Sequence, residues 1–167
     1  MAKNNNGSAM LTEDTTKTID HWVAKFPADK KRSALIQALM AAQEQNGGWI
    51  NCELTEAVAA YLDLPPVWAH EIVSFYSMFF DQPVGRHKVN LCTNISCWLN
   101  GAEDLLAHAE KKLGLKLGGT TEDGRISLIR EEECLAGCCG APMMVVDGHY
   151  HENLDIEKMD AILDGLE

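Results

Sequence analysis

Six cysteines are the residues of this 167-residue chain whose type and spacing could do chemistry. Four of them form two pairs, because four residues separate Cys92 from Cys97 and three separate Cys134 from Cys138. Thiolates are soft ligands for iron-sulfur clusters and zinc, and two pairs on two loops could surround one metal centre. Plant-type ferredoxins share the C-x4-C spacing, but zinc sites accept either spacing. The residues alone predict a four-cysteine metal site and leave both metals open.

The other two cysteines have weaker cases. Cys139 directly follows Cys138 and could replace it as a ligand, since the chemistry of the two side chains is the same. Cys52 is far from the others in sequence, and an isolated cysteine most often serves as a small apolar side chain, so we assign it no role. Gly137 and Gly140 flank the Cys138-Cys139 pair; they could let backbone N–H groups approach the sulfurs, or only allow a tight turn.

Several other kinds of site do not fit the pattern. A thiol-disulfide oxidoreductase typically has a C-x-x-C motif, which is missing from the sequence. A Rieske centre needs two histidine ligands interleaved with two cysteines, whereas His149 and His151 follow the last cysteine and are expected at the surface. The glycine pairs, at 47–48 and 118–119, do not form the G-x-G-x-x-G fingerprint of a dinucleotide site.

Charge and hydropathy restrict the partners. A net charge of -11 and a pI near 4.9 give a surface that repels nucleic acids and anionic lipids. No apolar run approaches the ~18 residues that a membrane-spanning helix needs, so we expect no direct membrane insertion. The polar opening, residues 1–16, resembles neither a secretory signal nor a transit peptide. These features predict a soluble protein of the cytoplasm, where cysteines stay reduced.

The elements that must position the cysteines fall into two domains after a flexible tail at residues 1–17. Residues 18–82 show helical periodicity, with expected helices at 18–26, 30–45, 53–62 and 67–76, and so predict a small helical bundle. Residues 83–167 alternate between expected strands, at 88–92, 125–130 and 143–146, and expected helices, at 98–113 and 155–166. A strand-helix-strand-strand-helix order predicts a thioredoxin-like α/β domain, and the whole chain is of the α+β class. Both cysteine pairs lie on or beside its loops.

Several short motifs are weak individually, but their order along the chain is specific. Through them the chain resembles the family of the 24 kDa subunit of respiratory complex I, also called the E subunit of NADH-quinone oxidoreductase. The resemblance runs from about Lys30 to the C-terminus. Its motifs are Asn46-Gly47-Gly48-Trp49-Ile50, Phe75-Tyr76-Ser77, Pro83-Val84-Gly85-Arg86-His87, Cys92 to Cys97, Thr121-Glu122-Asp123-Gly124-Arg125, and Cys134-Leu135-Ala136-Gly137-Cys138 followed by Ala141-Pro142. This family consists of thioredoxin-like 2Fe-2S ferredoxins with an N-terminal helical bundle.

The resemblance implies a function as well as a fold. It implies one 2Fe-2S cluster on Cys92, Cys97, Cys134 and Cys138, and thereby favours Cys138 over Cys139. It also implies a partner subunit that carries FMN and the NADH site, so that this chain is a non-catalytic redox subunit, peripheral to the inner membrane through its complex. Equivalent subunits serve NAD-linked hydrogenases and formate dehydrogenases, and a structural four-cysteine zinc module is the alternative of another class.

Three glutamates, Glu131, Glu132 and Glu133, immediately precede Cys134. Negative charge beside a cluster opposes uptake of an electron, so one hypothesis is that they lower its potential. The alternative is an ordinary solvated run of charge.

Overall fold

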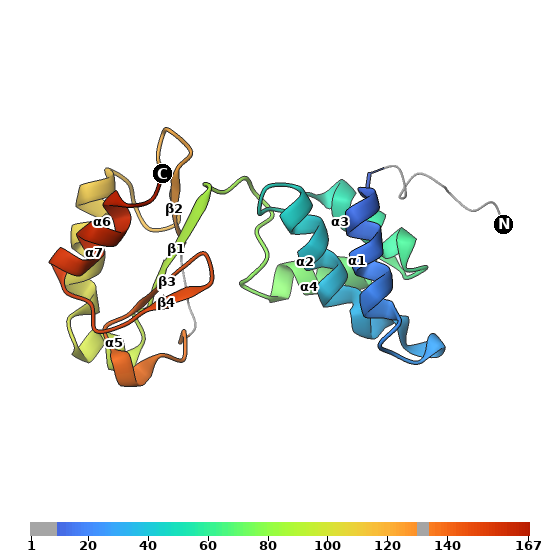
Figure 1. Cartoon of the computed structure of the whole chain (residues 1–167), viewed down its shortest axis with the longest axis horizontal. Coiled ribbons are helices and arrows are strands. Elements are labelled where there is room, and N and C mark those ends of the chain that lie inside the picture. Colours follow the sequence, from blue (N-terminus) through green and yellow to red (C-terminus); the bar gives the residue numbers. More distant parts are fainter. Residues whose placement is uncertain (1–9, 130–133) are drawn as a thin grey trace. The chain divides into compact units, whose positions relative to one another are not determined.

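The computed structural model describes residues 10–129 and 134–167 of the chain. It contains two compact units, Met1–Pro83 and Val84–Glu167. The first unit is helical, and the second combines helices with a four-stranded sheet (Figure 1). The predicted α+β class is therefore confirmed. In the two described ranges no helix has both the length and the apolar character needed to cross a membrane.

From residue 10 onward, the first unit contains four α-helices and one 3-10 helix: α1 (Glu13–Val23), η1 (Ala28–Ala34), α2 (Leu35–Gln45), α3 (Cys52–Tyr61) and α4 (Pro66–Phe75). Their apolar faces meet in one core that includes the fully buried Ile19, Leu39 and Val58. The expected helix at 30–45 is thus two elements, because the backbone at Lys30 leaves helical geometry and a 3-10 helix precedes α2. Pro66 occupies the first turn of α4, where its missing N–H costs no hydrogen bond.

The expectation of a flexible tail through residue 17 is wrong for the part that the structure describes. Helix α1 begins at Glu13 because the Thr12 hydroxyl caps it, accepting a hydrogen bond from the Thr15 N–H at 3.2 Å. Leu11 is buried, and the Gln45 side chain bonds both the Thr12 N–H and the Met10 carbonyl. The remainder of the expected tail, residues 1–9, lies outside the described ranges.

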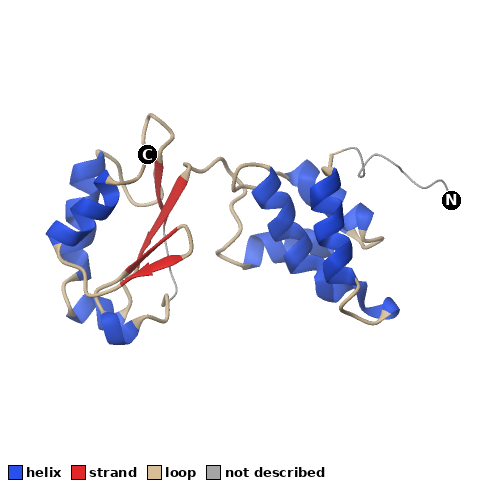
Figure 2. Ribbon diagram, in the orientation of Figure 1, coloured by secondary structure: helices blue, strands red, loops and turns tan. Residues whose placement is uncertain are grey.

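The second unit has a mixed sheet of the order β2-β1-β3-β4, from strands β1 (His87–Leu91), β2 (Ile126–Ile129), β3 (Met144–Val146) and β4 (His149–His151). Strand β1 pairs in parallel with β2 and antiparallel with β3, which forms a hairpin with β4. Helices α6 (Ala102–Leu113) and α7 (Ile156–Asp164) cover one face of the sheet (Figure 2). Leu105 of α6 and Leu163 of α7 join the strand residues in a buried core.

Two features of this unit differ from the expectation. The single helix expected at 98–113 is two helices, α5 (Ile95–Leu99) and α6, because Gly101 has a φ of +88°, which a helix cannot accommodate. Strand β4 was not expected. The turn predicted at Asp147-Gly148 is present, with φ values of 49° and 84°.

Candidate metal centre at the cysteine loops

Cys92 and Cys97 lie at the end of β1 and in the helix that follows. Cys92 is the first residue after β1, and its N–H donates to the Met143 carbonyl at 3.1 Å. This bond holds the start of the loop after β1 against the residue that precedes β3. Cys97 lies in α5, whose first turn is capped by the Asn94 side chain. Both thiols are buried, at 2% exposure each, beside Met143. This pair is therefore fixed by the packing of the domain.

Cys134 and Cys138 lie on the loop before β3, and both are exposed. Their sulfur atoms are 3.4 Å apart. The Ala136 N–H donates to the Cys134 sulfur at 3.4 Å, and Ala136 adopts a left-handed conformation with a φ of 62° at this position. The loop therefore folds back on itself and supplies one backbone N–H donor to the Cys134 sulfur.

That donor comes from Ala136, which the sequence did not single out. The Gly140 N–H donates instead to the Gly137 carbonyl, within the turn. A Cβ atom at Gly140 would lie 2.5 Å from the Glu152 Cβ, and one at Gly137 would lie 2.9 Å from the Met143 Cε. Both glycines therefore permit close packing of the loop.

Two side-chain hydrogen bonds hold the exposed loop to the rest of the unit. The Ser96 hydroxyl of α5 donates to the Cys138 carbonyl at 3.1 Å, and the Tyr150 hydroxyl of β4 donates to the Leu135 carbonyl at 2.9 Å. The structure thus brings the two thiol pairs together, and a set of four thiols suits an iron-sulfur cluster or zinc.

Cys97, Cys134 and Cys138 differ in their affinity for protons. Burial, followed by a hydrogen bond to Cys92, raises the pKa of Cys97 to about 11. The Ala136 N–H and then the Cys138 thiol lower the pKa of Cys134, while the same hydrogen bond to Cys134 raises the pKa of Cys138. The lowered pKa makes Cys134 ready to become a thiolate ligand.

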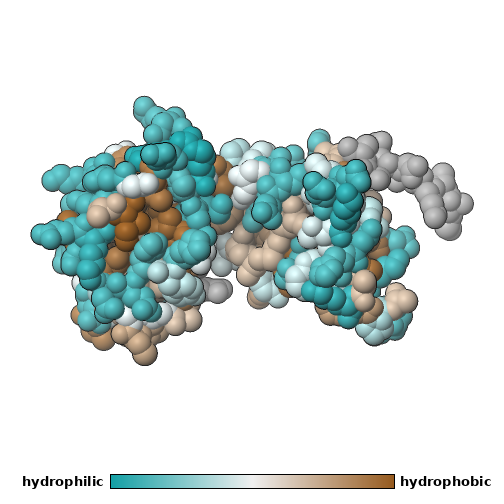
Figure 3. Space-filling model, viewed as in Figure 1, coloured by the Kyte–Doolittle hydropathy of each residue, from teal (hydrophilic) through white to brown (hydrophobic). Residues whose placement is uncertain are grey.

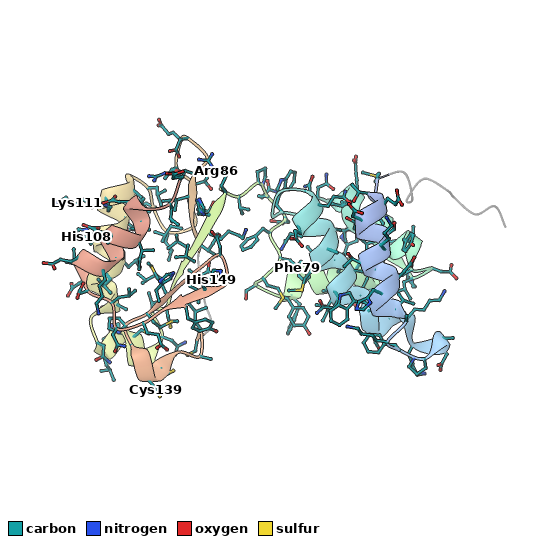
Figure 4. The ribbon with its side chains drawn as sticks, viewed as in Figure 1. Phe79, Arg86, His108, Lys111, Cys139 and His149 are labelled. Carbon is teal, nitrogen blue, oxygen red and sulfur yellow. The ribbon has the colours of Figure 1, made fainter. Side chains whose placement is uncertain are left out.

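The remaining residues considered from sequence lie as follows. Cys139 is exposed next to Cys138, and its side chain is labelled in Figure 4. His149, also labelled there, and His151 form the ends of the hairpin strand β4, with His149 exposed and His151 half-buried. Glu131, Glu132 and Glu133 lie outside the described residues. Cys52 is exposed on α3, so the interpretation of it as a buried apolar side chain is wrong.

Helix α5 presents an apolar surface beside the cysteines. Ile95, Trp98 and Leu99 are 72%, 52% and 70% exposed, although the same helix buries Cys97. Figure 3 shows apolar surface at this end of the second unit, over α5 and the short 3-10 helix η2 (Cys138–Gly140). Large exposed apolar side chains that lie together commonly mark a protein contact.

Known proteins match most of the length of this chain. The family model for the thioredoxin-like [2Fe-2S] ferredoxins matches residues 19–167. The E subunit of NADH-quinone oxidoreductase from Rickettsia bellii is 42% identical over 86% of this chain and 86% of its own. NADH dehydrogenase [ubiquinone] flavoprotein 2, mitochondrial, of Dictyostelium discoideum is 35% identical over 93% of this chain and 63% of its own.

A solved structure, an NAD+-reducing [NiFe]-hydrogenase in the air-oxidized state, superposes with a TM-score of 0.63 at 23% identity. The superposition covers 75% of this chain and 22% of the hydrogenase chain, and at this identity it shows a shared fold. The family model and the curated relatives each span most of the sequence. The chain therefore belongs to the thioredoxin-like [2Fe-2S] ferredoxin family, together with the E subunits of NADH-quinone oxidoreductases.

Proposed function

We propose that this chain is the electron-transfer subunit of an NADH-quinone oxidoreductase, and that Cys92, Cys97, Cys134 and Cys138 hold one 2Fe-2S cluster. The observation that carries the proposal is the contact between α5, which holds the buried Cys97, and the loop of the exposed pair, where the Ser96 hydroxyl donates to the Cys138 carbonyl. The names of the curated relatives and the family description support it. Such a cluster, when bound, takes up and releases single electrons.

The family description favours a cluster over the zinc alternative. The family model that matches residues 19–167 is that of the thioredoxin-like [2Fe-2S] ferredoxins, and four thiolates are the usual ligand set of such a cluster.

The chain's own residues would control the environment of the cluster. Burial of Cys92 and Cys97 keeps water from one side, while Cys134 and Cys138 leave the other side open. The Ala136 N–H stabilises negative charge on the Cys134 sulfur. Electrons would therefore enter or leave most readily on the exposed side.

The electron donor in this proposal is a partner subunit that binds NADH and FMN. The sequence has no dinucleotide fingerprint, so NADH would bind elsewhere in the complex. The apolar surface of α5, which consists of Ile95, Trp98 and Leu99, adjoins the cysteine loops, and we propose that the flavin subunit covers it. The chain would then be cytoplasmic and peripheral to the membrane through the complex.

We propose a quinone-reducing complex over a hydrogenase or formate dehydrogenase because the relatives at 42% identity carry the former name. The hydrogenase superposition, at 23% identity, supports only the fold.

NADH-driven reduction tests the proposal directly. The purified chain should keep its visible absorption when NADH is added alone. It should bleach when its co-expressed flavin subunit is also present, because only that subunit oxidises NADH. Bleaching by NADH without the partner would contradict the assignment of the NADH site, and no bleaching with an FMN-loaded partner would contradict the proposed route.

A further inference from the structure

Three metal-binding side chains gather in the helical unit, away in sequence from the cysteine loops. Cys52 and Glu56 lie four residues apart on one face of α3, and His70 lies on α4. The Cys52 Sγ is 3.9 Å from the His70 Nε2 and 3.8 Å from the Glu56 Oε1, and the latter two atoms are 3.5 Å apart. All three atoms lie within 4.8 Å of one another, so a single small ion can reach them together.

These distances are those that a bound zinc ion would impose. With Zn–S of about 2.3 Å and Zn–N and Zn–O of about 2.0–2.1 Å, tetrahedral angles give about 3.6 Å for S···N and S···O and about 3.4 Å for N···O. Each observed distance agrees within about 0.4 Å. The His70–Glu56 distance of 3.5 Å is too long for a good N–H···O hydrogen bond, which needs about 2.7–3.2 Å. Without an ion, the contacts that join the three side chains are the long hydrogen bonds of the Cys52 sulfur to Glu56 and His70.

The backbone places the three ligands firmly. Cys52 is the first residue of α3, and the Asn51 side chain caps that helix by accepting from the Leu54 N–H at 2.8 Å. Helix α3 packs against α4 through buried residues such as Val58 and Ala69. Two packed helices thus hold a thiol, a carboxylate and an imidazole in one place.

The position beside the three ligands is open. Cys52 and His70 line a cavity of about 720 Å³ within the first unit, together with Asp81 and Glu71. Three protein ligands with room for a water is the arrangement of an open zinc site. The additional carboxylates give this cavity the negative charge that attracts a cation.

We infer that Cys52, Glu56 and His70 form a second metal site, which binds zinc with one coordination position open to the cavity. Cys52 binds as the thiolate and releases its proton to solvent, and His70 binds as the neutral imidazole. A thiolate, an imidazole and a carboxylate together suit zinc better than magnesium or calcium, which prefer oxygen ligands. The ion would link α3 to α4 independently of the cluster.

Alkylation of Cys52 in the full, cluster-loaded chain tests the site. The protein is first treated with EDTA, then reacted with iodoacetamide with and without Zn²⁺, and the modification of Cys52 and of Cys139 is measured by peptide mass spectrometry. Zinc coordination removes the free thiolate, so Zn²⁺ should slow alkylation of Cys52 by about ten-fold or more. Cys139, which is also exposed, serves as the internal control and should react at the same rate in both samples.

Matched variants separate the site from non-specific binding. In His70→Gln and Glu56→Gln, Zn²⁺ should no longer protect Cys52 from most of the alkylation. Glu53→Gln changes a residue of α3 outside the trio and should keep the protection of Cys52 by Zn²⁺. Loss of protection with unchanged iron content would also show that the effect is separate from the cluster. Equal alkylation of Cys52 with and without Zn²⁺, or full protection in His70→Gln, would overturn the inference.

Discussion

At the scale of single residues, the choice between Cys138 and Cys139 is the sharpest question about the proposed centre. The Cys138 sulfur lies 3.4 Å from that of Cys134, and its carbonyl is held by Ser96. The adjacent Cys139 has the same chemistry and is also exposed, so only the direction of the side chain distinguishes the two.

Substitution of each residue by serine should therefore have unequal effects. Cys138→Ser removes a proposed ligand and should lose most of the iron and visible absorption of the purified chain, whereas Cys139→Ser should retain both. Iron analysis and absorbance after anaerobic purification give the answer. Loss of the cluster in Cys139→Ser alone would move the ligand assignment to that residue.

The spacing of the cysteines left Cys138 and Cys139 open as the partner of Cys134, and the family resemblance favoured Cys138. Neither predicted the protonation of these thiols. The shifts in pKa arise from burial of Cys97 and from the Ala136 N–H, which depend on the folded loop. Ala136 gave no signal in the sequence, because a left-handed alanine is unfavourable without a fold to hold it. Cys52 was misinterpreted because its partner His70 lies on another helix.

At the scale of elements, a histidine connects three parts of the second unit. His87, at the start of β1, has its Nδ1 2.7 Å from the Asp147 carboxylate and its Nε2 2.8 Å from the main-chain oxygen of Glu167. Both ring nitrogens face acceptors, so the protonated ring satisfies both. The hydrogen bond to Asp147 and then that to Glu167 raise the pKa of His87, against a smaller opposing effect of burial.

This raised pKa predicts a pH dependence of stability. The folded-state pKa of His87 exceeds the unfolded value of about 6.5. The protonated ring therefore stabilises the folded state fully below about pH 6.5, and this stabilisation is lost as the pH rises through the folded-state pKa. Such a partly exposed pair contributes at most about 1 kcal/mol, or roughly 2–4 °C in Tm.

The Tm of the unsubstituted chain should accordingly exceed that of His87→Gln near pH 6, and the difference should shrink near pH 9. His149→Gln, at an exposed position of β4, is the control and should follow the unsubstituted chain at both values. A gap between His87→Gln and the unsubstituted chain that stays constant or grows with pH would contradict the assignment.

Element boundaries were predictable where the local signal was strong. Helical periodicity predicted the four α-helices that the structure describes in the first unit, and Asp147-Gly148 predicted a turn. The start of α1 was missed although Thr12 followed by two acidic residues is a capping signal, because the first turn is polar. The three-residue strand β4 exists through its pairing with β3, which no local pattern reveals.

At the scale of the whole molecule, the proposed partner contact is the feature that links this chain to NADH. Ile95 and Leu99 are more than two-thirds exposed on the helix that carries Cys97. Interface residues of this kind can each contribute more than about 1 kcal/mol to binding. The sequence could not reveal this surface, because the break at Gly101 that leaves α5 as a short separate helix was not foreseen.

The double variant Ile95→Ser, Leu99→Ser should bind the flavin subunit at least about ten-fold more weakly while keeping its visible spectrum. Ile156→Ser, which replaces a 44% exposed apolar side chain on α7, is the matched control and should bind normally. Binding can be measured by titration of one purified subunit with the other. Equal affinity of the double variant and the control would place the contact elsewhere.

Electron paramagnetic resonance of the anaerobically purified chain, before and after dithionite, tests whether the four cysteines hold a 2Fe-2S cluster. We expect a coloured protein that is silent when oxidised and gives a spin-one-half signal when reduced, with two iron atoms per chain. A colourless, iron-free protein that stays silent after dithionite, with zinc bound by Cys92, Cys97, Cys134 and Cys138, would contradict it.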